Sequence, residues 1–179
     1  MQSVRNGVIY LIGPRGSGKT SVGRALAAAL AMDFADTDEH MLAETGETVA
    51  DVVARGGWEE FRRRESVALR AVSVPGRVVA TGGGMVLAET NRSHMRASGT
   101  VVYLRAPLEE LCRRVGLDDN RAGRPSLTGC HPVDEMAAIL RERAPLYEGT
   151  AHHILDCGDG VAVVVEQAIA VLQGTPGAK

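Results

Sequence analysis

The sequence predicts an α/β fold in which helices cover both faces of a parallel sheet. Short β-rich runs alternate with helical stretches from one end of the chain to the other. The first of these runs leads through a glycine-rich loop directly into a helix. We find no internal repeat or low-complexity tract, so residues 1–179 are expected to form a single domain. The expected strands lie near 8–12, 34–37, 78–81, 100–105 and 153–156, and the expected helices near 19–31, 40–45, 48–55, 58–73, 92–98, 107–115, 133–147 and 160–173.

Composition and charge exclude several classes of protein. A net charge of −2 leaves no basic surplus to neutralise a nucleic-acid backbone, and 3% aromatic residues offer few stacking surfaces for single strands. The three cysteines, Cys112, Cys130 and Cys157, are widely spaced and suit a reducing compartment. No run resembles a signal peptide or is long enough to span a bilayer. We therefore expect a soluble, cytoplasmic and monomeric protein that binds neither nucleic acid nor membrane.

The loop from Gly13 to Thr20 reads G-P-R-G-S-G-K-T and fits the phosphate-binding pattern G-x-x-x-x-G-K-[ST]. Its glycines allow positive φ, and the helix that follows adds unsatisfied N–H groups and the positive end of its dipole. Lys19 is expected to reach the β- and γ-phosphates. A glycine-rich turn without a ligand is the alternative, but the strand and helix on either side favour a nucleoside triphosphate site. The expected contacts are Gly16, Ser17, Gly18, Lys19, Thr20 and Ser21.

Two carboxylates, Asp36 and Asp38, follow the second expected strand. In an extended backbone, side chains two residues apart point to the same side. One carboxylate could then hold Mg²⁺ through water while the other faces an acceptor hydroxyl. The alternative is that one of them caps a helix that begins near Glu39.

Three consecutive glycines, Gly82 to Gly84, follow the third expected strand. Such a run is a poor strand or helix former and makes sense where backbone approaches a ligand closely. An ordinary tight turn is the alternative, although it would need fewer glycines.

Two arginines on expected helices could bind an anionic substrate. Arg62 is followed three residues later by Glu65, which can hold its guanidinium in a fixed orientation for a carboxylate. Its neighbours Arg63 and Arg64 are expected to lie on a solvated face. Spacing alone makes Arg143 an ordinary cation near a helix end.

The segment from Gly116 to Pro132 is rich in glycine and proline and has no predicted secondary structure. Connections of this length inside a domain are usually lids or binding loops. A tolerated surface insertion is the alternative. Arg121 and Arg124 favour a lid, because a mobile cation helps phosphoryl transfer when a site closes.

Taken together, these segments resemble the shikimate kinase family. The likeness covers nearly the whole chain, and the joint order and spacing of its segments are highly specific. The segments are G-P-R-G-S-G-K-T at 13–20, D-T-D at 36–38, G-W-E-E-F-R-R-R-E at 57–65, A-T-G-G-G-M at 80–85, V-V-Y-L at 101–104, R-P-S-L-T-G at 124–129 and R-E-R-A-P-L-Y at 141–147.

The resemblance implies a three-layer P-loop kinase fold with a five-stranded parallel sheet, a substrate-binding insertion at about 37–65 and a lid at about 116–133. It implies transfer of phosphate from ATP to the 3-hydroxyl of shikimate, with Mg²⁺, in the biosynthesis of chorismate and aromatic amino acids. The roles that it implies are as follows: Lys19 on the transferring phosphate; Thr20 and Asp36 on Mg²⁺; Asp38 on the shikimate hydroxyls and as candidate base; Arg62, Arg143 and the backbone of Gly83 at the shikimate carboxylate; Arg124 on the ATP phosphates; Arg114 against the adenine; and Arg15 facing the acceptor.

Three other functions share part of this pattern. A kinase for a nucleoside monophosphate or a sugar acid would have the same phosphate loop, but Arg62, Arg143 and Asp38 suit a carboxylated polyol better. A GTP-binding switch would need N-K-x-D and D-x-x-G motifs, which the sequence lacks. A nucleotide-binding protein without catalytic activity would be expected to lack one of the family's catalytic positions, and none is missing.

Overall fold

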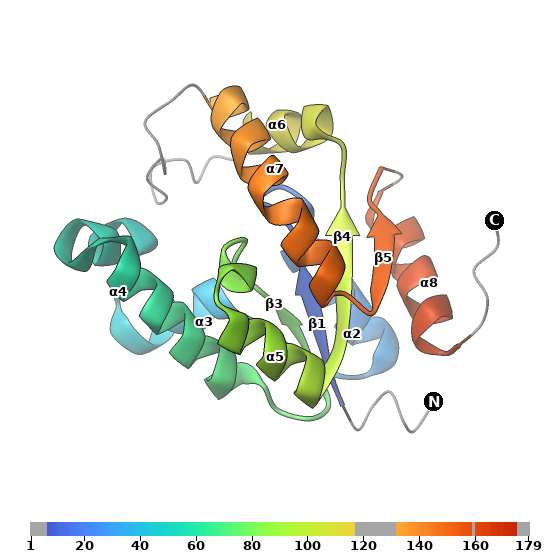
Figure 1. Cartoon of the computed structure of the whole chain (residues 1–179). Helices are drawn as coiled ribbons and strands as arrows, with labels where there is room; N and C mark the ends of the chain where they lie inside the picture. Colours follow the sequence, from blue (N-terminus) through green and yellow to red (C-terminus); the bar gives the residue numbers. More distant parts are fainter. Residues whose placement is uncertain (1–6, 117–131, 159, 175–179) are drawn as a thin grey trace.

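The structure is a computed structural model that describes residues 7–116, 132–158 and 160–174. Strands and helices alternate along it, as the sequence predicts (Figure 1). The elements are β1 (Val8–Ile12), α2 (Lys19–Leu30), β2 (Asp33–Asp36), α3 (Thr37–Thr45), α4 (Val49–Val72), β3 (Arg77–Ala80), the 3₁₀ turn η1 (Met85–Leu87), α5 (Glu89–Ser98), β4 (Gly99–Arg105), α6 (Leu108–Gly116), α7 (Pro132–Thr150), β5 (His153–Asp156) and α8 (Val161–Leu172).

The five strands form one sheet in the order β2-β3-β1-β4-β5, and every neighbouring pair is parallel. The predicted α/β fold with a five-stranded parallel sheet is therefore confirmed. β1 lies at the centre of the sheet, and all five of its residues are buried. Because a parallel sheet is covered on both faces, its central strand is apolar throughout instead of alternating with polar residues.

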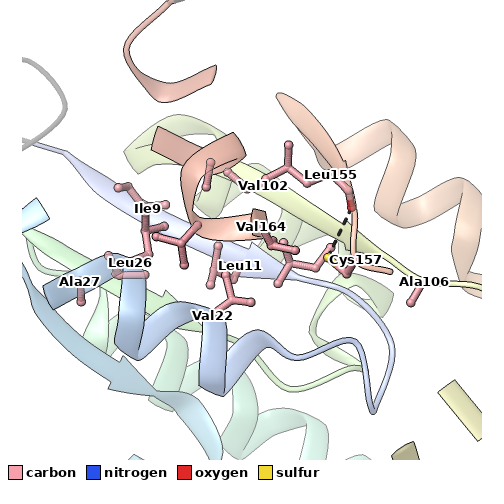
Figure 2. Packing of buried hydrophobic residues seen from close by; sticks show 14 of the residues in the cluster. Ile9, Leu11, Val22, Leu26, Ala27, Val102, Ala106, Leu155, Cys157 and Val164 are labelled. Atoms are coloured by element: carbon pink, nitrogen blue, oxygen red, sulfur yellow. Dashed lines mark hydrogen bonds between the residues drawn. The ribbon is translucent and has the colours of Figure 1, made fainter. Parts of the chain in front are cut away.

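Two hydrophobic clusters pack on opposite faces of the sheet. Ile9 and Leu11 of β1 lie in a cluster with residues of α2 and α8, including Leu26 and Val164 (Figure 2). The alternate β1 residues lie in the second cluster with residues of α4, α5 and α7. Side chains that alternate along β1 thus fill the two interfaces between the sheet and the helical layers of a helix–sheet–helix sandwich.

A third, smaller cluster lies away from the sheet, between α3 and α4. It is built from Met41, Val52, Phe61 and Ala68, with Trp58 packed against it. These residues fall largely within the region 37–65, which therefore has an apolar centre of its own.

The sequence predicts two helices, over 48–55 and 58–73, where the structure has one long helix with an internal break. Inside α4, Gly57 has φ 72° and ψ −179°, which is a conformation outside the helical region. A residue with a Cβ rarely adopts this positive φ, so glycine allows the change of direction. The predicted gap and the break coincide.

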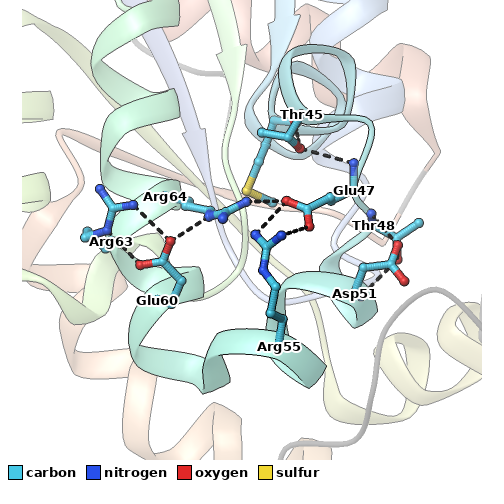
Figure 3. A network of polar contacts seen from close by, with 9 residues as sticks. Thr45, Glu47, Thr48, Asp51, Arg55, Glu60, Arg63 and Arg64 are labelled. Carbon is cyan, nitrogen blue, oxygen red and sulfur yellow. Dashed lines mark hydrogen bonds and ion pairs between the residues drawn. The ribbon is translucent and has the colours of Figure 1, made fainter.

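Ion pairs connect the two halves of α4 across this break (Figure 3). Glu47 accepts from Arg55 before the break at 2.9 Å and from Arg64 after it at 2.7 Å, and Arg64 also pairs with Glu60 at 2.8 Å. The expectation that Arg64 is solvated is wrong, because its side chain is only 19% exposed and holds two carboxylates. Arg63 is exposed, as predicted.

Most of the segment predicted as a lid, about 116–133, lies outside the described residues, together with Arg121 and Arg124. Within the described ranges, no helix combines the length and the apolar character needed to cross a bilayer.

Candidate active site

Three loops meet at the carboxyl ends of neighbouring strands: the phosphate loop after β1, the turn into α3 after β2, and the glycine run after β3. This edge of a parallel sheet is where ligands bind in α/β folds. A cavity of about 390 Å³ lies there. Its lining consists of Arg15, Gly16, Gly18, Lys19, Thr20, Ser21, Asp36, Asp38, Thr81 and Gly83. The structure thus brings five of the six predicted phosphate-loop contacts, the two aspartates and one of the three glycines around one space. The sixth, Ser17, is fully buried and does not line the cavity.

The phosphate loop leaves the start of α2 open to an anion. Gly18 is the residue before α2, has φ 91°, and supplies no side-chain cap to the first N–H groups of the helix. A non-glycine residue would be strained at this φ. The ammonium of Lys19 donates to the carbonyl oxygens of Gly13 at 2.9 Å and Pro14 at 2.7 Å. The uncapped N–H groups and the lysine together give the site a positive character suited to phosphate.

Asp36 connects the phosphate loop to the segment after β2. Its Oδ2 accepts from the hydroxyl of Thr20 at 2.8 Å, and its Oδ1 accepts from the backbone N–H of Asp38 at 2.9 Å. Two hard oxygen ligands, a hydroxyl and a carboxylate, therefore lie side by side at the cavity. This is the donor set that Mg²⁺ takes when it also binds phosphate oxygens and water.

The prediction that Asp36 and Asp38 share one side of an extended strand is wrong. β2 ends at Asp36, and α3 begins at Thr37, so that Asp38 lies in the first helical turn. Asp36 caps this helix, which is the alternative that the sequence left open. Capping and contact with Thr20 use different oxygens of the same carboxylate, so the two roles are compatible.

The glycine run after β3 forms a β-turn that is attached to its surroundings by hydrogen bonds. The N–H of Met85 donates to the carbonyl of Gly82 at 3.0 Å, and the N–H of Gly82 donates to the hydroxyl of Thr37 at 2.9 Å. Gly84 has φ −96° and ψ −1°, as in the third position of a type I turn. Glycine leaves space here for two side chains, since a Cβ at Gly84 would overlap the present position of the Arg62 guanidinium and one at Gly82 would overlap that of the Glu65 carboxylate.

Arg62 and Arg143 reach this turn from two different helices. Arg62 on α4 forms an ion pair with Glu65, as its spacing predicts. Arg143 on α7 is 7% exposed, and its Nη1 donates to the carbonyl of Gly83 at 3.3 Å. Its Nε is buried without a hydrogen-bond partner among the described residues. A buried guanidinium with an unused donor suits a further acceptor, such as a carboxylate.

Glu65 is only 3% exposed, and burial raises its pKa to about 7. Arg62 opposes this increase, whereas the nearby charge of Asp38 adds to it. The carboxyl group therefore gains or loses its charge near neutral pH, next to an arginine of the site.

Arg114 on α6 lies beside the phosphate loop. Its Nη1 donates to the carbonyl of Gly16 at 3.3 Å, its Nη2 donates to the carbonyl of Cys157 at 2.9 Å, and its Nε pairs with Glu110 at 2.6 Å. These three contacts hold the guanidinium plane at the edge of the nucleotide-binding loop. Arg114 does not line the cavity, and its contact with the base stays a prediction; Arg124 lies outside the described residues.

Two residues of this region had no predicted role. Thr37 is 1% exposed and holds Gly82, and Tyr147 is 1% exposed and donates to the carbonyl of Gly83 at 2.5 Å. Each contact joins residues at least 45 positions apart. No local pattern indicates such a contact, although both residues lie inside the quoted family segments.

With this geometry established, comparison with known proteins identifies the family. The family model described as Shikimate kinase matches residues 15–173. This chain belongs to the shikimate kinase family. It is 56% identical over 157 residues to Shikimate kinase 2 of Dickeya chrysanthemi, covering 88% of this chain and 91% of that protein. It is 52% identical over 165 residues to Shikimate kinase 2 of Syntrophotalea carbinolica, covering 92% and 96%.

A solved structure agrees with this membership of the shikimate kinase family. The shikimate kinase of Acinetobacter baumannii, in complex with shikimate, superposes with a TM-score of 0.89 at 33% identity over 97% of each chain. The resemblance recognised in the sequence segments is thereby confirmed.

Proposed function

We propose that this protein transfers the terminal phosphoryl group of ATP to the 3-hydroxyl of shikimate, giving shikimate 3-phosphate and ADP. The reaction is a step in the biosynthesis of chorismate and the aromatic amino acids. One observation carries the proposal beyond family membership: Arg62 and Arg143 converge from two helices on a glycine turn, and that turn reaches the cavity of the phosphate loop. A small acid bound by the arginines would therefore lie next to the phosphates of the nucleotide.

At the nucleotide end, the N–H groups of the phosphate loop and the start of α2 hold the phosphates. Lys19 exchanges its contacts with loop carbonyls for contacts with phosphate oxygens and stabilises the charge of the transferring group. Gly16, Ser17, Gly18 and Ser21 supply backbone and hydroxyl contacts, and Arg114 lies against the adenine. Positioning and charge stabilisation are most of what phosphoryl transfer needs from a protein.

At the acceptor end, Arg62 and Arg143 bind the carboxylate of shikimate together with backbone amides beside Gly83. Asp38 lines the cavity and faces the hydroxyl groups of the ring. It accepts the hydrogen bond from the 3-hydroxyl and takes its proton as that oxygen attacks the phosphorus. Arg15, which also lines the cavity, contacts the acceptor from the side of the phosphate loop.

Thr20 and Asp36 would hold Mg²⁺ through the hydroxyl of the one and the carboxylate of the other. The fit rests on their adjacent oxygens, which lie 2.8 Å apart at the cavity. When bound, Mg²⁺ supplies positive charge at the β- and γ-phosphate oxygens.

We further assign residues about 37–65 to the substrate-binding insertion and residues about 116–133 to a lid that brings Arg124 onto the ATP phosphates. Closure of this lid would exclude water and so prevent hydrolysis of ATP. We also propose that the enzyme acts as a monomer. Its widely spaced cysteines suit the cytoplasm, and its net charge of −2 suits neither nucleic acid nor an anionic membrane.

The decisive experiment is a comparison of acceptors in a coupled ADP-release assay. ATP turnover should appear with shikimate and be nearly absent with gluconate or AMP. The indole of Trp58 lies 5.5 Å from the guanidinium of Arg62, so shikimate should also change the intrinsic fluorescence in a saturable manner. Normal ATP binding with a flat shikimate titration would contradict the proposed substrate.

A further inference from the structure

The hydroxyl of Tyr147 is attached to the acceptor side of the site. It donates to the carbonyl of Gly83 at 2.5 Å from a side chain that is 1% exposed. The ring stacks on Tyr103 of β4, with centroids 5.0 Å apart and an angle of 23° between the planes. Tyr147 thus presents a fixed hydrogen-bond donor from α7 to the middle of the glycine turn.

This donor keeps its proton under all ordinary conditions. Burial raises the pKa of Tyr147 above the usual phenol range. A neutral hydroxyl can donate to a backbone carbonyl, whereas a phenolate could not. The hydroxyl of Tyr147 therefore stays able to donate to the carbonyl of Gly83.

The glycine turn needs such a contact from outside. A run of three glycines has more conformational freedom than any other tripeptide, so its amides are not held in place by the chain itself. The turn uses the carbonyl of Gly82 and the N–H of Met85 for its own hydrogen bond, so the amides of the central residues Gly83 and Gly84 lie outside it. Because the peptide unit is planar and trans, holding the carbonyl of Gly83 also fixes the direction of the N–H of Gly84.

We infer that Tyr147 is a positioning residue for the acceptor carboxylate: its hydroxyl holds the Gly83–Gly84 peptide so that the N–H of Gly84 stays presented to that carboxylate. Tyr147 acts through the backbone and does not itself contact the acceptor. This inference rests on the proposed function, since it assigns the amides to the carboxylate of shikimate. Thr37 holds the other end of the turn through the N–H of Gly82.

The test is Tyr147→Phe, which keeps the ring against Tyr103 and removes only the hydroxyl. Arg143 still donates to the carbonyl of Gly83, so the carbonyl keeps a partner and the loss is at the lower end for a buried hydrogen bond. We expect the KM for shikimate to rise about fivefold, which corresponds to ~1 kcal/mol. The KM for ATP and kcat should change less than about twofold, because the nucleotide contacts are untouched.

The matched control is Tyr103→Phe, which removes a hydroxyl from the ring stacked on Tyr147 and should leave the KM for shikimate unchanged. A second comparison uses an acceptor analogue whose carboxylate is reduced to a hydroxymethyl group. The loss in kcat/KM caused by Tyr147→Phe should be much smaller for this analogue, since it lacks the group that the amides bind.

Three results would overturn the inference: an unchanged KM for shikimate, an equal loss for shikimate and the hydroxymethyl analogue, or a variant that no longer folds. Loss of folding would show that the hydroxyl of Tyr147 is needed for the stability of the fold and not for positioning the acceptor. Failure of the proposed function is distinguishable, because the wild-type protein itself would then not turn over shikimate.

Discussion

Replacing Gly84 by alanine should selectively weaken the binding of shikimate. A Cβ at this position would overlap the guanidinium of Arg62. The backbone at Gly84 has φ −96° and ψ −1°, which alanine can adopt, so the conflict is with the arginine and not with the turn. Since the guanidinium is the end of a flexible side chain, we expect Arg62 to move away while the fold is kept.

The size of the effect follows from the contact that is lost. A hydrogen bond to a charged group contributes ~1.5–3 kcal/mol, which corresponds to about a 10- to 100-fold increase in the KM for shikimate. Steady-state kinetics with each substrate varied in turn measures this increase. The KM for ATP should stay within about twofold, because Arg62 does not line the nucleotide cavity.

Gly149→Ala is the matched control. Gly149 lies in α7, where a Cβ would meet no atom within 4 Å, and alanine is favoured over glycine inside a helix by ~1 kcal/mol. This variant should have wild-type kinetics and an equal or higher Tm. Our reasoning would be refuted if Gly84→Ala bound shikimate normally, or if the KM for ATP rose by the same factor.

Three further predictions test other parts of the site. Arg62→Ala should raise the KM for shikimate ~10- to 100-fold by loss of a charged hydrogen bond, whereas Arg63→Ala, at an exposed position, should not; equal effects in kinetic assays would contradict the assignment. Thr20→Val removes an oxygen next to Asp36, so titration of activity with Mg²⁺ should show a several-fold higher half-saturating concentration, and an unchanged value would count against Thr20 as a ligand. Burial raises the pKa of Glu65 to about 7 in the folded protein, compared with about 4.5 in the unfolded chain. The contribution of Glu65 to the free energy of unfolding is therefore fully present below pH 4.5, where the group is neutral in both states, and is lost as the pH rises through 7. The wild type should therefore lose thermal stability relative to Glu65→Gln between pH 5 and 8, and parallel profiles in differential scanning calorimetry would disprove the shift.

Hydrophobic patterning was sufficient to predict the sheet. Each of the five strands lies within a residue or so of its predicted position, because a strand such as Val8–Ile12 is a short apolar run with turn residues at its end. The break at Gly57 coincides with the predicted gap between two helices, since glycine marks a change of backbone direction in sequence and in structure alike. The 3₁₀ turn η1 was not predicted, because three residues carry no periodic signal.

The sequence was informative about the candidate site where a short motif determines the local backbone conformation. It was not informative where the site depends on contacts between residues far apart in the sequence. The phosphate loop specifies its conformation through its glycines and the helix that follows, so Lys19 and Thr20 were assigned from sequence alone. Arg143 could not be distinguished from an ordinary helix-end cation, because its place in the site depends on a buried contact with Gly83, which is 60 residues away. The local geometry of Asp36 and Asp38 was wrongly predicted, since the helix begins two residues earlier than its polar sequence suggests.

The nucleotide and acceptor ends of the site are joined by side chains that form hydrogen bonds to one another or to the backbone. Asp36 accepts hydrogen bonds from the hydroxyl of Thr20 and from the first helical turn of α3. Thr37, the next residue, connects the start of α3 to the glycine turn by accepting from the N–H of Gly82. Tyr147 connects the same glycine turn to α7. Because Asp36 and Thr37 are adjacent, the end of β2 sets the distance between the candidate Mg²⁺ ligands and the amides for the carboxylate. In-line transfer requires the attacking oxygen and the phosphorus to be held close together, and this continuous set of contacts provides that rigidity without a covalent intermediate.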